Sequence, residues 1–240
     1  MPDPQPFAGQ IALVTGASRG IGAATATALA AAGAHVVLTG RDTKALEGVE
    51  QAIYQAGGSA TIAPVDLAEP DGVARLAAAL SQRWQALDML VLSAAYFPQL
   101  TPVTQLDSRE FNKTLTLNLM AQHALLAHCD RLLKASSNAR VIALTSSVGA
   151  DPRPYWGAYG ASKAALEALL ASYAEEVRAT SKIRVAIVDP GATRTAMRAR
   201  AYPGEDPASV KPPEVVAARI AALAAEPFAS MHRERVNHAA

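Results

Sequence analysis

Tyr159 and Lys163 are the residues whose types and spacing could do chemistry, in the segment Tyr155-Trp-Gly-Ala-Tyr159-Gly-Ala-Ser-Lys163. On a helix, this spacing places the phenol and the ammonium on one face, a turn apart. A cation beside a phenol favours the phenolate, so we expect the Tyr159 pKa to fall below its usual value of about 10. Such a tyrosine can give or take a proton at a carbonyl or an alcohol. The same spacing also occurs on solvated helix faces, so other motifs must support it.

The composition excludes several kinds of partner. Half of the 240 residues are hydrophobic, and the net charge is +1 with no run of like charges, so nucleic acid and membrane surfaces are not expected partners. No apolar run approaches the ~18 residues that span a bilayer, and residues 1–7 do not resemble a signal peptide. Cys129 is the only cysteine and the five histidines do not cluster. We therefore expect a cytoplasmic protein with no disulfide and no metal site.

Short apolar runs alternate with long Ala-rich stretches along the whole chain. This alternation predicts an α/β fold, in which a parallel sheet is covered by helices on both faces. No linker divides the chain, so we expect one domain over residues 1–240, with tails at 1–8 and about 231–240 and a weak edge strand near 235–237. The expected strands are 11–15, 35–39, 60–64, 89–93, 140–145 and 184–188, and the expected helices are 21–32, 44–56, 70–85, 108–134, 156–180 and 213–225.

A glycine-rich segment, Thr15-Gly16-Ala-Ser-Arg-Gly20-Ile-Gly22, joins the first expected strand to the first expected helix. Glycines at this position allow a tight turn and a close approach of the backbone to a pyrophosphate. The helix N-terminus adds N–H donors and a partial positive charge. The alternative is a glycine-rich turn that binds nothing, but its place between strand and helix favours a dinucleotide site.

The two motifs together resemble the short-chain dehydrogenase/reductase family, and the resemblance runs from about residue 9 to residue 225. The family's Thr-Gly-x-x-x-Gly-x-Gly is matched by Thr15, Gly16, Gly20 and Gly22, and its Tyr-x-x-x-Lys by Tyr159 and Lys163. The resemblance implies a Rossmann-type, doubly wound parallel sheet with strand order 3-2-1-4-5-6, which a weak seventh strand could extend. It also implies hydride transfer between a nicotinamide cofactor and a carbonyl or secondary alcohol.

The segment after the second strand, Thr39-Gly40-Arg41, bears on which dinucleotide is bound. An acid at position 40 would accept hydrogen bonds from ribose hydroxyls, but this chain has glycine there. Arg41 and Arg19 can instead pair with a 2′-phosphate, which predicts NADP(H) rather than NAD(H). Asp42, close by, is the residue that argues against this choice. By resemblance, Asp66 and Leu67 lie at the adenine, although Asp66 could instead cap a helix.

The remaining catalytic roles follow from the resemblance. Ser146 would hydrogen-bond the substrate oxygen, with Ser147 as the alternative, and Asn118 would hold a water that links Lys163 to solvent. Lys163 would also hold the nicotinamide ribose. The full set of expected cofactor contacts is Gly16, Ser18, Arg19, Gly20, Ile21, Gly22, Arg41, Asp66, Leu67, Ser93, Ala94, Tyr159, Lys163, Pro190, Gly191, Thr193 and Thr195.

One segment departs from the family pattern. The family usually has Asn-Asn-Ala-Gly after the fourth strand, whereas this chain has Leu92-Ser93-Ala94-Ala95. The departure leaves a rival reading open, a scaffold or sensor with the same fold that binds a cofactor but turns nothing over.

The expected substrate is a small carbonyl compound or alcohol. Residues 196–212 are rich in proline and resemble a mobile lid. An apolar lining is expected from Tyr96, Phe97, Tyr155, Trp156 and Met197, which could equally be core or interface residues. The resemblance also implies a homodimer or homotetramer paired through the long fourth and fifth helices.

Overall fold

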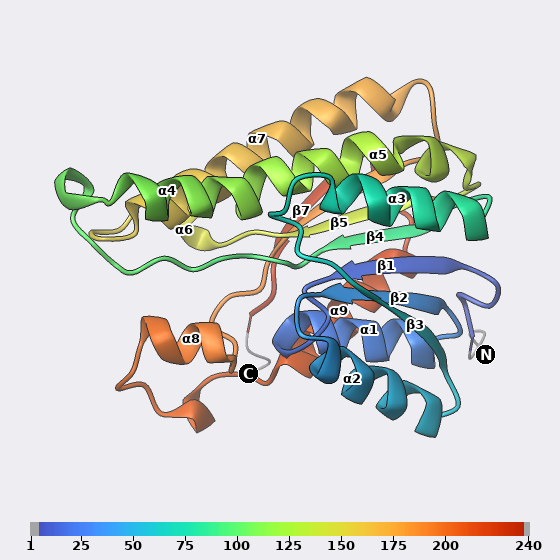
Figure 1. Ribbon diagram of the computed structural model, residues 1–240, viewed down its shortest axis with the longest axis horizontal. Coiled ribbons are helices and arrows are strands. Elements are labelled where there is room, and N and C mark those ends of the chain that lie inside the picture. Colours follow the sequence, from blue (N-terminus) through green and yellow to red (C-terminus); the bar gives the residue numbers. More distant parts are fainter. Residues whose placement is uncertain (1–4, 238–240) are drawn as a thin grey trace.

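A computed structural model describes residues 5–237 and contains a sheet of seven parallel strands in the order β3-β2-β1-β4-β5-β6-β7 (Figure 1). The fold class predicted from the sequence is therefore confirmed, and the seventh strand is present. The strands are β1 (Ile11–Thr15), β2 (His35–Gly40), β3 (Ser59–Pro64), β4 (Met89–Leu92), β5 (Arg140–Leu144), β6 (Arg184–Asp189) and β7 (Met231–Arg235).

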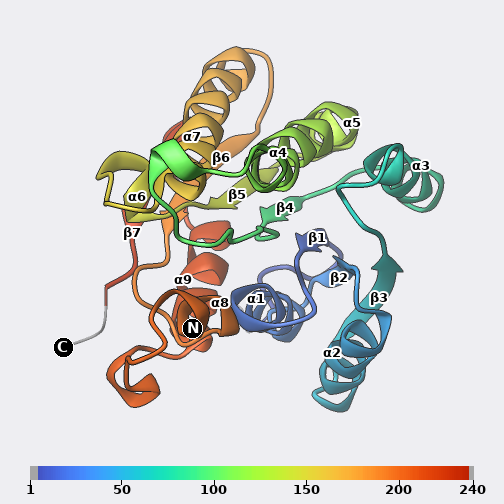
Figure 2. The same cartoon turned by 60° about the vertical axis from the view of Figure 1, so that its left-hand side comes forward.

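Helices cover both faces of this sheet, as Figure 2 shows from the end of the molecule. One layer holds α3 (Gly72–Arg83), α4 (Ser108–Leu115), α5 (Ala121–Ala135) and α7 (Gly157–Arg178), and the other holds α1 (Gly20–Ala31), α2 (Thr43–Gln55) and α9 (Pro213–Ala225). Alternate residues of each central strand point to opposite faces. Leu13 of β1 accordingly packs under the first layer, and its neighbours Ala12 and Val14 pack under the second.

The expected long helix over residues 108–134 is interrupted by one π-helical stretch. Between α4 and α5, residues Thr116–Met120 form a π-helix, so the chain remains helical through three labelled segments. Single π-helical turns within α-helices occur often at functional sites. This one contains Asn118, which is completely buried.

The short helical elements gather beyond the carboxyl ends of the strands. They are α6 (Ser147–Ala150), α8 (Ala196–Ala201) and the 3₁₀ turns Val103–Gln105 and Pro207–Ser209. In Figure 1, α8 lies beyond the same end of the sheet at which α4 begins. In open α/β sheets, ligands bind at this edge, and the segment 196–212 lies there.

Two expectations about the chain ends are wrong. The segment from Met231 is an ordered strand rather than a tail, and it begins four residues before the expected edge strand. At the other end, Phe7 is buried in the core and its N–H donates to the carbonyl of Ala32, so the expected tail of residues 1–8 is anchored there. The parts of both expected tails at residues 1–4 and 238–240 lie outside the described residues. Across 5–237, no helix combines the length and the apolar character needed to cross a membrane.

Candidate active site

Two adjoining cavities open at the carboxyl edge of the sheet. The larger has a volume of about 820 Å³ and the smaller about 260 Å³, and Tyr159 lines both. The larger cavity brings together most of the expected cofactor residues, namely Gly16, Ser18, Arg19, Gly20, Ile21, Gly22, Arg41, Asp66, Leu67, Ser93, Ala94, Tyr159, Lys163, Pro190 and Thr195. The expected residues Ser146, Gly191 and Thr193 line the smaller cavity instead.

The floor of the larger cavity is the turn between β1 and α1. Gly16 and Gly20 have φ values of 65° and 58°, which glycine adopts without strain. A Cβ atom on Gly22 would lie 2.2 Å from the carbonyl oxygen of Gly16, so no larger residue fits there. The Thr15 hydroxyl accepts hydrogen bonds from the N–H groups of Ser93 and Ala94, which holds this turn against the end of β4. The backbone therefore forms a cradle with the shape that a pyrophosphate needs.

The segment Leu92-Ser93-Ala94-Ala95 lies directly against this turn. A Cβ on Gly16 would lie 2.9 Å from the Cα of Ala94, and one on Gly22 would lie 3.1 Å from the Ser93 hydroxyl oxygen. Ala95 also lines the larger cavity. The residues that depart from the family pattern thus pack against the glycine turn and leave the cavity open.

Arg41 and Asp66 mark the far end of the larger cavity. Their side chains approach to 3.8 Å, and the Arg41 side chain is 61% exposed, so a ligand can still reach it. Asp42 is engaged locally, because its carboxylate accepts the N–H of Ala45 and caps α2. Asp66 does not cap α3, which begins at Gly72; it accepts the N–H of Ala68 instead. Neither acid offers its carboxylate to the cavity as freely as Arg41 offers its guanidinium.

Tyr159 and Lys163 project from the first turns of α7 into the junction of the cavities. The Tyr159 hydroxyl lies 3.8 Å from the sulfur of Met197, and the ammonium of Lys163 donates to the carbonyl of Leu144 at 2.8 Å. The ammonium is 5.6 Å from the centre of the Tyr159 ring. Both side chains are buried.

The expected lowering of the Tyr159 pKa is wrong for the chain alone. Burial raises the pKa of Tyr159, and the negative charge of Asp189 raises it further. Burial also lowers the pKa of Lys163 to about 8, and Glu167 partly opposes this effect. Desolvation is the largest cause of both shifts. The Lys163 ammonium is bonded to the Leu144 carbonyl and stands 5.6 Å from the centre of the phenol ring.

The two candidate serines differ in their surroundings. The Ser147 hydroxyl accepts a hydrogen bond from Arg153 at 3.2 Å. Ser146 has an extended backbone, and its hydroxyl has no hydrogen-bond partner among residues 5–237. Both line the smaller cavity with Tyr159. Of the two hydroxyls, that of Ser146 is therefore the free one.

Asn118 lines neither cavity, but its side chain connects Tyr96 to Ser162 through hydrogen bonds. Its amide oxygen accepts the N–H of Tyr96 at 2.7 Å, and its amide nitrogen donates to the Tyr96 carbonyl and to the Ser162 hydroxyl at 2.9 and 3.0 Å. Ser162 in turn donates to the carbonyl of Tyr159. Both amide protons are used within the protein, so the relay water expected from the resemblance would have to donate to an oxygen of Asn118.

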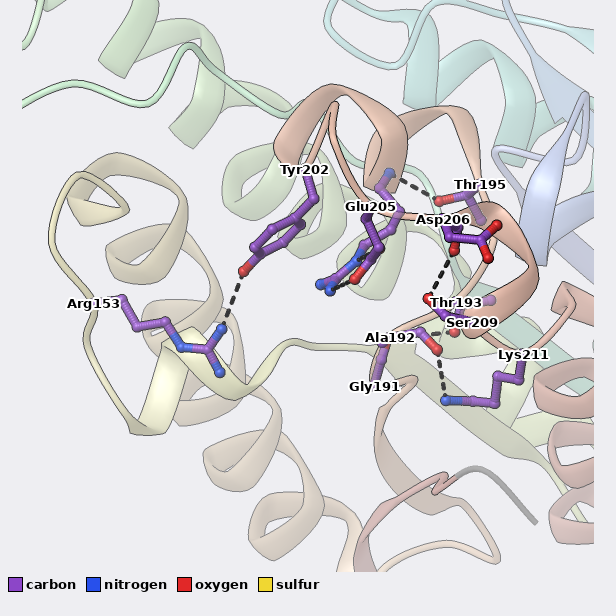
Figure 3. Close-up of polar contacts among 11 residues, drawn as sticks. Arg153, Gly191, Ala192, Thr193, Thr195, Tyr202, Glu205, Asp206, Ser209 and Lys211 are labelled. Carbon is purple, nitrogen blue, oxygen red and sulfur yellow. Dashed lines mark hydrogen bonds and ion pairs between the residues drawn. The ribbon is translucent and has the colours of Figure 1, made fainter. Parts of the chain in front are cut away.

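The loop after β6 closes the cavities on the side of α8. The Thr195 hydroxyl accepts the N–H of Arg198 and caps α8, and its methyl carbon lies 3.4 Å from the place of a Cβ on Gly20. The Thr193 hydroxyl is turned into its own loop and donates to the carbonyl of Pro190. Lys211 holds the same loop by donating to the carbonyl of Ala192 at 2.9 Å (Figure 3).

Among the aromatic residues expected in the substrate lining, Tyr155 does not line either cavity. It is 57% exposed, whereas Phe97 and Trp156 pack in one cluster with Tyr159 and Met197. Tyr96 lines the larger cavity, and its hydroxyl donates to Glu110.

Sequence reasoning missed Glu167, which lies one turn beyond Lys163 on α7. Its side chain is 9% exposed, and its carboxylate binds Arg233 of β7 and the hydroxyl of Thr145. The spacing Tyr-x-x-x-Lys-x-x-x-Glu could have revealed it, because residues four apart share a helix face. Arg233 could not have been found in this way, because it reaches the site from the last strand.

Comparisons with known proteins agree with this geometry. The family described as short chain dehydrogenase matches residues 10–206, and the chain therefore belongs to that family of oxidoreductases. It is 33% identical over 207 residues to the oxidoreductase YciK of Escherichia coli K12, a match that covers 85% of this chain and 81% of YciK. It is 32% identical over 207 residues to an NADPH-dependent aldehyde reductase-like chloroplastic protein of Arabidopsis thaliana, with 81% and 76% covered.

Solved structures extend the likeness to the whole fold. A protein of Escherichia coli CFT073, solved in complex with NADPH, superposes with a TM-score of 0.92 at 30% identity. The superposition covers 99% of this chain and 100% of that chain. The family resemblance predicted from the glycine and tyrosine motifs is confirmed.

Proposed function

We propose that the protein is an NADPH-dependent reductase of a small carbonyl compound, which it converts to the secondary or primary alcohol. The observation that carries the proposal is the placement of Tyr159, which lies where a cavity suited to a dinucleotide meets a second cavity of about 260 Å³. Two relatives or neighbours of this chain have NADPH in their descriptions.

The residues of the larger cavity fit NADPH along its length. The glycine cradle at Gly16 and Gly22 would hold the pyrophosphate with backbone N–H groups, because a side chain on Gly22 would fill it. Arg19 and Arg41 would hold the 2′-phosphate, and Gly40 between them adds no negative charge. Lys163 would hold the nicotinamide ribose at the other end.

When bound, NADPH supplies a hydride to the carbonyl carbon of the substrate. Ser146 donates its free hydroxyl to the carbonyl oxygen and stabilises the charge that develops there. Tyr159 gives that oxygen its proton. A phenol whose pKa lies at or above its usual value of about 10 carries this proton at neutral pH, and burial keeps the pKa of Tyr159 above that value.

The decisive experiment compares wild type with Tyr159→Phe. The variant keeps the ring, which packs on Phe97 at 5.3 Å between centroids, and loses only the acid. Reduction of an aldehyde panel should fall by about 1,000-fold or more, since the acid and its positioning are lost together. The affinity for NADPH, followed by cofactor fluorescence, should change little.

Wild-type rates in Tyr159→Phe would overturn the proposed mechanism. NADPH binding with no turnover of any carbonyl by wild type would favour the scaffold or sensor. That alternative rests on the Ser93–Ala95 departure, which lies against the glycine turn.

We further infer a homodimer or homotetramer formed through α4, α5 and α7, as the family resemblance implies. Met120, at the junction of α4 and α5, is 58% exposed. Light scattering after size exclusion tests the inference, and a mass near the 24.9 kDa of one chain would contradict it. The cytoplasmic location stays a prediction.

A further inference from the structure

The smaller cavity carries more positive charge than its surroundings neutralise. Arg153, Arg198 and Arg235 all line it. Arg198 is balanced by Glu205, whose carboxylate oxygens lie 2.7 and 2.5 Å from the guanidinium. Arg235 faces Asp189 at 3.6 Å. Two of the three charges therefore have a carboxylate partner.

Arg153 is the third, and it has none. Its guanidinium donates to the Tyr202 hydroxyl at 3.2 Å (Figure 3). It also donates to the Ser147 hydroxyl at 3.2 Å. No Asp or Glu oxygen among residues 5–237 lies within 4.0 Å of it. Both acceptors are hydroxyls, so each still has a proton to donate. One guanidinium with two hydroxyls beside it is a set of donors suited to an oxyanion.

The backbone holds Arg153 in this position. It lies between Pro152 and Pro154, which restrict the chain on both sides to extended geometry. The turn is closed by a hydrogen bond from the N–H of Trp156 to the Arg153 carbonyl, with Tyr155 at a φ of 73°. A tyrosine in the left-handed region is strained, and such strain is concentrated at ligand sites.

An aromatic wall joins Arg153 to the proton donor. The rings of Tyr159 and Trp156 are 6.1 Å apart between centroids, and those of Trp156 and Tyr202 are 5.9 Å apart. Tyr202 is the residue whose hydroxyl binds Arg153. A ligand that touches Tyr159 at one end and Arg153 at the other therefore lies along two successive ring contacts.

We propose that the substrate is a carbonyl compound with a carboxylate at the far end of a flat apolar body. Tyr159 and Ser146 take the carbonyl, the wall packs against the body, and Arg153 with Tyr202 and Ser147 binds the carboxylate. A single unpaired guanidinium balances one negative charge, which fits a carboxylate better than a phosphate dianion beside Asp189 and Glu205. This inference rests on the proposed function and names its substrate class.

The test uses terephthalaldehydic acid and its methyl ester, which share an aldehyde and a ring and differ in charge. Wild type with NADPH should reduce the acid with a kcat/KM about tenfold or more above that of the ester. Arg153→Gln should lower kcat/KM for the acid about 10- to 100-fold and leave the ester within about twofold. Tyr202→Phe should lower kcat/KM for the acid about threefold.

Arg178→Gln is the control, because it removes the same charge from the exposed end of α7. It should leave kcat/KM unchanged for both the acid and the ester. No preference for the acid in wild type, or an equal loss on acid and ester in Arg153→Gln, would overturn the carboxylate site.

A binding measurement separates this proposal from the reductase itself. Calorimetry should show benzoate binding to wild type more tightly than benzamide, with the difference lost in Arg153→Gln. If no aldehyde is turned over but this difference appears, the reductase fails and the anion site stands. If neutral aldehydes are reduced and benzoate binds no better than benzamide, the anion site fails alone.

Discussion

The two cavities are built from different materials. The larger one includes the turns after β1, β2 and β4, and the shape of the turn after β1 depends on Gly16 and Gly22, which leave no room for a Cβ atom. The smaller one is formed by side chains of segments far apart in the chain, such as Arg153 and Tyr202, which meet 49 positions apart. A backbone turn is kept in every protein with the same fold, whereas single substitutions can change the side chains that line a cavity. Proteins of one fold can thus share a cofactor site and differ in their substrate site.

The largest effect should follow from filling the backbone cradle. Gly22→Ala places a Cβ 2.2 Å from the Gly16 carbonyl oxygen, so the turn must move. We expect NADPH affinity to fall about 100-fold or more, because the backbone N–H groups would no longer point at the pyrophosphate. Fluorescence titration measures it.

Gly48→Ala is the matched control, since a Cβ on this α2 glycine meets nothing within 4 Å. It should raise the free energy of unfolding by about 0.5–1 kcal/mol and leave NADPH affinity unchanged. Equal NADPH affinity in Gly22→Ala and wild type would mean that the larger cavity does not depend on its glycine backbone, and the two cavities would no longer differ in this respect.

A single side chain of the cofactor cavity should have a smaller, selective effect. Arg41→Gln should weaken NADPH binding about tenfold and leave NADH binding unchanged, since only NADPH carries the 2′-phosphate. Lys44→Gln is the control, because it removes a nearby exposed charge of α2. It should leave the affinities for NADPH and NADH unchanged. An equal loss of affinity for NADPH and NADH in Arg41→Gln would show that Arg41 only supports the loop.

The smallest effect should be a change of pH dependence through Glu167. Lys163 loses its proton as pH rises through its pKa of about 8, and Glu167 raises that pKa. Glu167→Gln should therefore lower the Lys163 pKa and move the alkaline limb of kcat/KM to lower pH, with activity retained in acid. Glu175→Gln, an exposed acid on the same helix, is the control. An unmoved alkaline limb would mean that Glu167 acts only as an anchor for β7.

The difference between the cavities also explains what the sequence could predict. The glycine turn and the core strands follow from local patterns, since the turn lies between one strand and one helix and the core strands are continuous apolar runs. The strand order was implied only by the family resemblance. The Tyr159 pKa was predicted wrongly because spacing shows a neighbour but not burial. The proposed anion site at Arg153 depends on the meeting of the segment that holds Ser147 and Arg153 with Tyr202, 49 positions beyond Arg153, which no local pattern encodes.

For a related reason, β7 was predicted only as a weak edge strand near residues 235–237, four residues after the strand begins. Its residues Met-His-Arg-Glu-Arg form an edge strand with no apolar alternation. Their charges are used in ion pairs, with Arg233 on Glu167, Glu234 on Arg219 and Arg235 near Asp189. A strand held by such pairs looks like a solvated tail in the sequence.

The π-helix between α4 and α5 has an evolutionary consequence. A π-helical turn absorbs one extra residue while the helices on either side keep their phase. Deletion of one residue between Leu115 and Asn118 would therefore join α4 and α5 into a regular helix with both buried faces kept. Asn118 would be turned away from Tyr96 and Ser162, to which it is now bonded. The fold and the glycine turn would then remain, while the site would lose the bonds by which Asn118 holds Tyr96 and Ser162.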